Sequence, residues 1–267
     1  MSRSTRALVT NDDGIDSPGL AVLAEAASEA GLDVVVAAPE HQFSGASAAL
    51  TAVQEDGRTV VQEVDGPGGL PAYAVRAAPA HIVVAGLQGW FDPVPDVVLS
   101  GINRGGNVGR AVLHSGTVGA ALTAGLHDRR GLAVSLDVPL GAEEDEHWDA
   151  VREYLPRVLD LLLDSPLGST LSLNVPDRPV ERHRELRLAP LDPRGVVQTL
   201  VEDSDGQGLL LREVETGERA QPDSDRALLA AGHPTLTALR GLTEDPDLLV
   251  PERLAHAARL IDERTSA

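Results

Sequence analysis

The sequence predicts an α/β fold built on a mostly parallel sheet, and two observations predict it. Short apolar segments at 6–10, 34–38 and 96–100 indicate buried strands, and a segment with helical spacing separates the first two. A strand, a helix and a second strand within forty residues are typical of a parallel βαβ unit. A polar loop follows each apolar segment, so functional groups are expected at the carboxyl edge of the sheet.

The first strand leads directly into an acidic turn. Arg6–Thr10 is expected to be a buried strand, and the segment 11–14 (Asn-Asp-Asp-Gly) follows it at once. On an extended strand two neighbouring carboxylates point to opposite faces, but Gly14 eases a turn that lets them converge. Ser17 is expected to cap the next helix, with Pro18 at its first position.

The remaining elements follow from periodicity and from turn residues. Strands are expected at 59–64, 72–75, 132–136 and 170–174, and helices at 79–87, from about residue 117, and at 146–163. After about residue 180, alternating segments at 186–191, 196–201 and 209–213 favour antiparallel ribbons, and a last helix is expected at 251–263. Residues 1–176 are therefore predicted to form the core, and 177–267 a β-rich extension with a terminal helix.

The composition excludes several classes of chemistry. The 267 residues carry a formal net charge of −19, and all 22 basic residues are arginine, which excludes a lysine nucleophile and a P-loop lysine. The acidic surface and the aromatic content of 2% argue against a nucleic-acid polymer as partner. The sequence has no apolar run long enough for a membrane, no signal-peptide pattern and no cysteine, so we expect a cytoplasmic protein without a membrane partner.

Oxygen-bearing side chains gather in the three polar loops. They are Asn11, Asp12, Asp13, Ser44, Ser47, Asn103 and Asn107, with Ser115 and Thr117 just beyond. Two carboxylates in a crevice repel each other unless a cation lies between them, and an all-oxygen site suits Mg²⁺ or Mn²⁺. Small residues at a helix start let backbone amides approach an anion. The combination is typical of metal-assisted hydrolysis of phosphate esters.

Each of these motifs has a simpler explanation when it is taken alone. An Asp-Asp-Gly turn is more often a solvated turn before a helix than a metal site, and the glycine-rich segment 101–109 lacks the spacing of a dinucleotide-binding loop. His41, His81 and His114 are not favoured as acid–base groups, because a lone loop histidine is more often structural or solvated. It is the joint occurrence of the polar loops that favours a metal site.

Four segments resemble the signature segments of the SurE survival-protein family. They are VTNDDGIDSPGL at 9–20, SG at 44–45, VVLSGINRGGNVG at 97–109 and HSGTVGAA at 114–121. The resemblance continues through SLNVP at 172–176 and through 223–239, and so covers nearly the whole chain in the expected order. It implies a Rossmann-like three-layer α/β/α core, with a C-terminal hairpin arm and helix that pack on a partner subunit in a homodimer or homotetramer. It also implies a metal-dependent acid phosphatase that acts as a 5′(3′)-nucleotidase.

The resemblance assigns roles residue by residue. Asp12, Asp13, Ser44 and Asn103 would hold one divalent cation per subunit, Mg²⁺ or Mn²⁺, and Asp12, Asp13 and Asn103 would be catalytic. The phosphate of a nucleotide substrate would be bound by Asn11, Asn107, Ser115, Gly116 and Thr117. A water activated by the cation is the nucleophile that the family's precedent favours, and attack by Asp13 itself stays open as an alternative.

Some residues around the predicted site depart from the family pattern. The usual Gly-Thr-Pro-Ala-Asp-Cys is Ala77–Ile82 here, so that Ala78 and His81 replace a hydroxyl and a carboxylate, and the tyrosine expected before Ser115 is His114. The predicted metal ligands are all retained. Two alternatives follow: a phosphatase for another phosphorylated metabolite, or a protein that binds a nucleotide without hydrolysing it.

Overall fold

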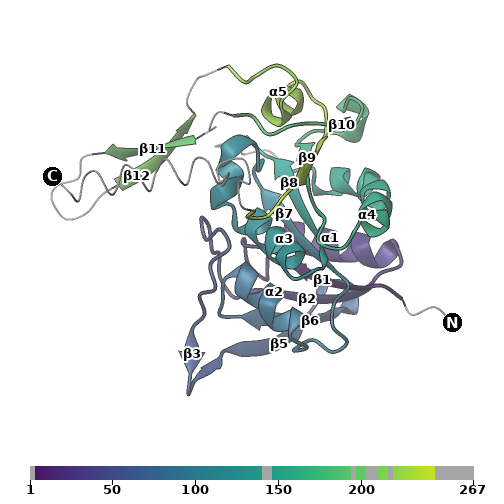
Figure 1. The fold of residues 1–267 in the computed structure, drawn as a ribbon, viewed down its shortest axis with the longest axis vertical. Coiled ribbons are helices and arrows are strands. Elements are labelled where there is room, and N and C mark those ends of the chain that lie inside the picture. The colour runs from purple at the N-terminus through teal and green to yellow at the C-terminus, as the bar shows by residue number, and fades with distance from the viewer. Residues whose placement is uncertain (1–3, 140–145, 194–196, 203–209, 216–218, 244–267) are drawn as a thin grey trace, which may run out of the picture.

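The structure is a computed structural model, and the residues it describes are 4–139, 146–193, 197–202, 210–215 and 219–243. Within them, nine strands form one sheet in the order β10-β13-β9-β8-β7-β1-β2-β6-β5 (Figure 1). Their bounds are β1 Arg6–Thr10, β2 Asp33–Pro39, β5 Val61–Asp65, β6 Pro71–Val75, β7 Val97–Arg104, β8 Arg130–Asp137, β9 Thr170–Pro176, β10 Arg187–Leu188 and β13 Thr235–Leu239. Two small ribbons pair β3 (Gln54–Glu55) with β4 (Arg58–Thr59) and β11 (Val197–Glu202) with β12 (Leu210–Glu215).

The centre of the sheet is parallel, as the sequence predicts. Strands β6, β2, β1, β7, β8 and β9 all run in the same direction, and β5 and β13 flank them antiparallel. The chain proceeds from β1 to β2 on one side and from β7 to β8 on the other. The connections therefore diverge at the carboxyl ends of β1 and β7, the place where ligands bind in open α/β sheets.

Helices cover both faces of the sheet. Their bounds are α1 Pro18–Glu29, α2 Pro79–Leu87, α3 Gly116–Leu126, α4 Leu155–Asp164 and α5 Asp225–Ala230. Ala7 and Val9 of β1 belong to the core cluster that includes residues of α1 and α4, whereas Leu8 lies in the cluster of α2 and α3. Side chains of a strand alternate between its faces, so every residue of β1 is buried. The three-layer prediction is confirmed.

Three local expectations need correction. The strand expected at 96–100 continues as β7 to Arg104, with an irregular register between Ser100 and Asn103. The helix expected at 146–163 is a 3₁₀ turn, Trp148–Glu153, followed by α4; Pro156 in the first turn of α4 lacks the N–H that one continuous helix needs. Ser17 does occupy the N-cap position of α1, but its side chain makes no capping hydrogen bond.

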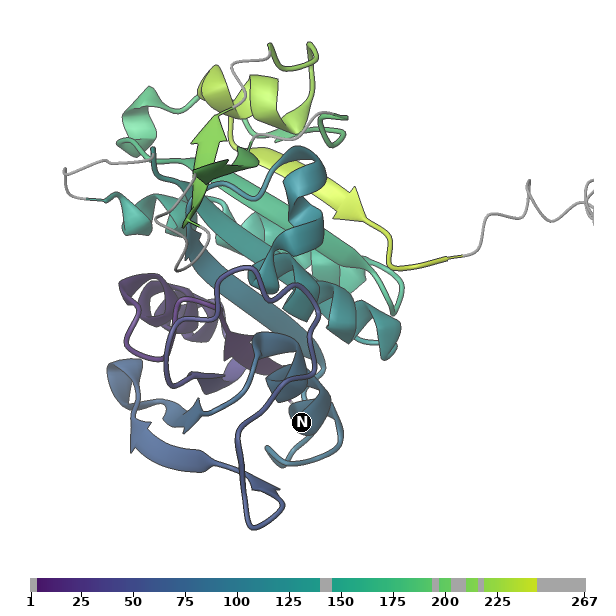
Figure 2. The same cartoon turned by 90° about the vertical axis from the view of Figure 1, so that its left-hand side faces the viewer.

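The later part of the chain completes the main sheet. The ribbon expected at 196–201 and 209–213 is confirmed as β11 and β12, which Figure 1 shows extending away from the sheet. The antiparallel ribbon expected at 186–191 is wrong, because β10 spans two residues and pairs parallel with β13. Figure 2 shows α5 and β13 at one end of the molecule and β5 at the other. The helix expected at 251–263 lies outside the described residues, and the domain boundary at 176 stays a prediction.

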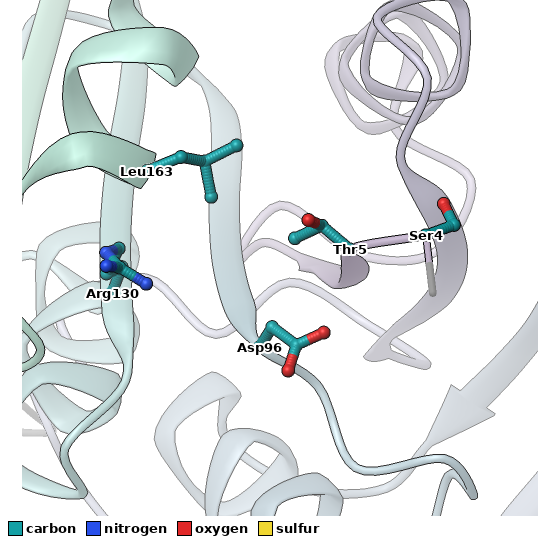
Figure 3. A pocket seen from close by; sticks show the side chains of 5 residues that line it. All are labelled: Ser4, Thr5, Asp96, Arg130 and Leu163. Carbon is teal, nitrogen blue, oxygen red and sulfur yellow. The ribbon is translucent and has the colours of Figure 1, made fainter. Parts of the chain in front are cut away.

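A separate cavity lies at the amino ends of the central strands, opposite to the carboxyl ends where the predicted site residues lie. A volume of about 380 Å³ at the amino ends of β1, β7 and β8 is lined by Ser4, Thr5, Asp96, Arg130 and Leu163 (Figure 3). Three of these side chains have structural partners: Asp96 accepts the Arg6 N–H at 2.8 Å, Arg130 donates to the Ser165 carbonyl at 2.8 Å, and the Ser4 hydroxyl donates to the Gly31 carbonyl at 3.2 Å. The cavity contains none of the predicted site residues. In the described part of the chain, no helix has the length and apolar character needed to cross a membrane.

Candidate metal and phosphate site

The two carboxylates that follow β1 reach different neighbours. Asp12 is 6% exposed and accepts a hydrogen bond from the hydroxyl of Thr117 at the start of α3. Asp13 is half-buried, and its Oδ2 accepts the backbone N–H of Arg104 at the end of β7, at 3.2 Å. Gln42 adds a long contact to Asp13 Oδ1, at 3.5 Å. The turn therefore places one carboxylate against α3 and the other against β7.

Asn11 closes the turn with its own side chain. Its Nδ2 donates to the Gly14 carbonyl at 3.0 Å, and its Oδ1 accepts the Gly14 N–H at 3.2 Å. Gly14 has a φ of 106°, which a residue with a Cβ rarely adopts. The turn is also joined to the loop after β2, because the Phe43 N–H donates to the Asp12 carbonyl at 2.7 Å. This contact brings Ser44, the next residue and an exposed one, to the side of the acidic turn.

Burial raises the pKa of both carboxylates. The pKa of Asp12 rises from its ordinary 3.8 to about 6, because burial outweighs the hydrogen bond from Thr117, and the charge of Asp13 raises it further. Burial also raises the pKa of Asp13, against the opposing effects of the Arg104 N–H and of the Arg104 charge. Neighbouring carboxylates held in this way favour a cation, whose charge offsets the cost of ionising them.

Asn103 is the residue before Arg104, whose N–H bonds to Asp13, and so places an amide near the acidic turn. It is half-buried, and its Nδ2 donates to the Gly105 carbonyl at 2.7 Å, which leaves its oxygen available to a cation. Within the described residues, no three of His, Cys, Asp or Glu come together as a metal cluster. The set Asp12, Asp13, Ser44 and Asn103 instead offers two carboxylates, a hydroxyl and an amide oxygen. Such a set fits Mg²⁺ or Mn²⁺, since Mg²⁺ is usually held by one or two carboxylates and keeps several waters.

The first turn of α3 packs directly against Asp12. Ser115 is its N-cap and accepts the Val118 N–H at 3.1 Å, as expected for a serine at this position. A Cβ added to Gly116 would lie 2.7 Å from Asp12 Oδ2, so only glycine allows this approach. The hydroxyl of Thr117 donates its hydrogen bond to Asp12. The part of this helix start that can bind an anion is therefore its backbone amides, which carry partial positive charge.

The loop between β7 and α3 is held by residues that the sequence did not single out. Asn174 of β9 accepts the Asn107 N–H at 2.8 Å and donates to the Asn107 carbonyl at 3.0 Å. Ser135 of β8 accepts from Asn107 Nδ2 at 2.8 Å. Asn103, Ser135 and Asn174 are paired side by side across β7, β8 and β9. Asn103 is predicted from the loop expected after a strand, whereas Ser135 and Asn174 lie inside the strands expected at 132–136 and 170–174. A polar residue near the carboxyl end of a buried strand is the signal that could have identified them.

The three loop histidines named in the sequence analysis lie in different surroundings. His41 is exposed beside Glu40, at 3.8 Å, and His81 Nε2 lies 3.2 Å from the hydroxyl of Thr59. His114 is exposed at the residue before Ser115, next to the start of α3. Only His114 is therefore adjacent in sequence to the predicted phosphate-binding turn.

Known proteins resemble this chain along most of its length. The family model described as "Survival protein SurE" matches residues 7–196. The 5′-nucleotidase SurE of Dehalococcoides mccartyi is 35% identical over 238 residues, 88% of each chain. The 5′/3′-nucleotidase SurE of Erwinia tasmaniensis is 35% identical over 239 residues, 88% of this chain and 89% of the relative. The crystal structure of the SurE protein from Aquifex aeolicus has the same fold, with a TM-score of 0.75 at 24% identity, over 91% of this chain and 96% of that one. The chain belongs to the SurE survival-protein family.

Proposed function

We propose that this protein is a metal-dependent phosphomonoesterase that releases phosphate from nucleoside 5′-monophosphates and, as a second class of ester, from 3′-monophosphates. The observation that carries the proposal is the contact between Asp12 and the first turn of α3, where a Cβ on Gly116 would lie 2.7 Å from Asp12 Oδ2. A carboxylate pair suited to a cation thus lies beside a helix start suited to phosphate. The relatives named as 5′-nucleotidase and 5′/3′-nucleotidase support the choice of substrate.

The proposed metal ligands are Asp12, Asp13, Ser44 and Asn103. When bound there, Mg²⁺ or Mn²⁺ would offset the charge of the phosphoryl oxygens and lower the pKa of a coordinated water. The chain's own residues hold the ligands in place: Thr117 orients Asp12, and the Arg104 N–H orients Asp13. Partners of this kind fix the direction in which a ligand presents its oxygen.

The phosphate of the substrate would be bound at the start of α3. The backbone N–H of Gly116 would donate to a phosphoryl oxygen and gain strength as charge grows there in the transition state. The Thr117 N–H faces Asp12, whose pKa it lowers, and would share its positive end between Asp12 and the phosphate. Ser115 keeps this turn in shape through its bond to Val118. Asn11 and Asn107 are the further proposed phosphate ligands, and each also supports the site, since Asn11 closes the acidic turn and Asn107 fixes the loop before α3.

Phosphate release from a substrate panel tests the proposal. The panel contains nucleoside 5′- and 3′-monophosphates, ribose 5-phosphate, glycerol phosphate and tripolyphosphate, each with Mg²⁺, with Mn²⁺ and with EDTA. We expect release from at least one nucleoside monophosphate with metal, loss of release in EDTA, and recovery when metal is restored. Release that persists in EDTA would contradict the metal dependence. Release from the other esters alone would indicate a different phosphorylated metabolite, and nucleotide binding without release would indicate a non-catalytic protein.

A further inference from the structure

We propose that Asp225, in the first turn of α5, is a positioning residue for the phosphate-binding turn at the start of α3. The inference rests on the proposed function, because it assigns a role in binding the phosphate. Asp225 belongs to the late part of the chain, more than a hundred residues from the turn that it would position. Its Oδ2 accepts the backbone N–H of Gly109 at 2.8 Å, in the loop that joins β7 to α3.

The carboxylate of Asp225 is fully buried and joins three segments of the chain. Its side chain is 0% exposed, and besides Gly109 its Oδ1 accepts the N–H of Asp192 at 2.8 Å and the N–H of Arg226 at 2.7 Å. Burial raises the pKa of Asp225, and these three N–H groups oppose that rise. A buried carboxylate is costly unless hydrogen bonds satisfy it. The bonds to two distant segments and to the following residue explain why an acceptor, and not an apolar side chain, occupies this position.

The backbone of Gly109 is held by Asp225, six residues before the N-cap of the phosphate-binding turn. It begins the 3₁₀ turn Gly109–His114, and Ser115, the N-cap of α3, follows at once. Two residues before Gly109, the backbone of Asn107 is already held by Asn174. The bond from Gly109 to Asp225 therefore sets where the chain leaves Asn107 and enters the 3₁₀ turn. The acidic turn is closed by Asn11, and Asp13 is held by the Arg104 N–H; neither of these bonds involves α3 or Asp225.

The variant Asp225→Asn separates the bond to Gly109 from the bonds to Asp192 and Arg226. An asparagine has one acceptor oxygen, which satisfies the N–H groups of Asp192 and Arg226 when it takes the place of Oδ1. The amide NH₂ then faces the N–H of Gly109, and two donors repel each other. The expected result is displacement of Gly109 and of the 3₁₀ turn, with the acidic turn left in place.

Asp192 provides a matched control in the same network. It is also 0% exposed, and its Oδ2 accepts the Gln221 N–H at 2.9 Å and the Ser224 hydroxyl at 3.0 Å. Asp192→Asn therefore perturbs a buried aspartate of the same region while the carboxylate of Asp225, and its bond to Gly109, stay in place.

The test measures phosphate binding and metal binding separately. Calorimetry gives the affinity of the protein for Mn²⁺ alone, and of the Mn²⁺-loaded protein for inorganic phosphate; thermal unfolding gives the stability of each variant. We expect Asp225→Asn to weaken phosphate binding about tenfold, the effect of losing one well-placed hydrogen bond from the α3 turn to the charged phosphate. Mn²⁺ affinity should fall by clearly less, because Asp13 keeps its bond to the Arg104 N–H. Asp192→Asn is expected to lower the unfolding temperature without weakening phosphate binding. If Asp225→Asn does not fold, Asp225→Glu, which displaces the carboxylate by one methylene, replaces it with the same expectation.

Three results would overturn the inference. They are unchanged phosphate affinity in the Asp225 variant, equal weakening in the Asp225 and Asp192 variants, and no phosphate binding by the parent protein. Because binding is measured without turnover, an absence of nucleotide hydrolysis would contradict the proposed function and not this inference.

Discussion

Asp12→Asn is expected to lower kcat for phosphate release at least about a hundredfold and, at the same time, to stabilise the metal-free protein at neutral pH. The first effect follows because asparagine lacks the charge that a divalent cation requires, although its oxygen can still accept the hydrogen bond from Thr117. The second follows from burial, which raises the pKa of Asp12 from 3.8 to about 6. A shift of about two pKa units corresponds to about 3 kcal/mol, which the folded metal-free protein loses at pH 7 by keeping this carboxylate charged.

The sign of the pH dependence follows from the same shift. Between about pH 4 and pH 6 the folded state binds a proton at Asp12 more readily than the unfolded state does, so this group adds stability as the pH falls. The stabilisation by Asp12→Asn should therefore be largest at pH 7 and disappear near pH 4. Thermal unfolding in EDTA across this range measures it, with Asp16→Asn as the control at an exposed aspartate of the same loop. A variant that is less stable than the parent at pH 7 would contradict the inference that burial makes the charged form of Asp12 unfavourable in the folded protein.

Gly116→Ala should reduce both Mn²⁺ affinity and phosphate release, the latter by about a hundredfold. The added Cβ would lie 2.7 Å from Oδ2 and 2.9 Å from Cβ of Asp12, closer than real Cβ atoms approach other atoms. Neither the first turn of α3 nor the side chain of Asp12 can move away easily, because Ser115 caps the helix and Thr117 bonds to Asp12. The clash therefore moves the proposed metal ligand away from the proposed phosphate-binding turn. Overpacking of this kind also costs about 1–3 kcal/mol of stability.

A second glycine variant separates the local effect from general destabilisation. Gly131 begins the buried part of β8, and a Cβ there would lie 2.1 Å from the carbonyl of Ala121, in the middle of α3 and away from its first turn. Gly131→Ala is expected to lower the unfolding temperature while the folded protein keeps its Mn²⁺ affinity and its kcat/KM. Calorimetry and phosphate release on both variants make the comparison. Full activity in Gly116→Ala would show that the contact with Asp12 is not needed for function.

The sequence predicts those elements best whose signals are local. The bounds of β1 match the expected strand, and those of α2 match the expected helix, where Pro79 pre-sets the first turn. The single helix expected at 146–163 is wrong for a local reason as well. Its apolar spacing is helical, but Pro156 has no N–H to donate, and a separate helix begins there. Strands β10 and β13 are different. β13 pairs with β9 and β10 pairs with β13, and periodicity along the chain does not encode such long-range pairing.

The same division applies to the candidate site. The strand-end loops identified Asp12, Asp13 and Asn103, because parallel strands bring their carboxyl ends to one edge. The contact of Thr117 with Asp12 joins residues that are 105 positions apart, and that of Asp225 with Gly109 joins residues 116 apart. Neither contact follows from the local pattern. Asn11 and Asn107 were expected to bind phosphate, and their side chains instead bond to Gly14 and to Ser135 in this structure; their contact with substrate stays a prediction.

The central claim is that Asp12, Asp13, Ser44 and Asn103 form the binding site of one divalent cation. The most direct measurement is an anomalous difference map from crystals grown with Mn²⁺, recorded for the parent protein and for Asp13→Asn. We predict one strong peak per chain in the parent, within coordination distance of oxygens of Asp12, Asp13 and Asn103, and loss of that peak in the variant. A Mn²⁺ peak elsewhere in the chain, or an equally strong peak in Asp13→Asn, would contradict the assignment of these residues as the metal site.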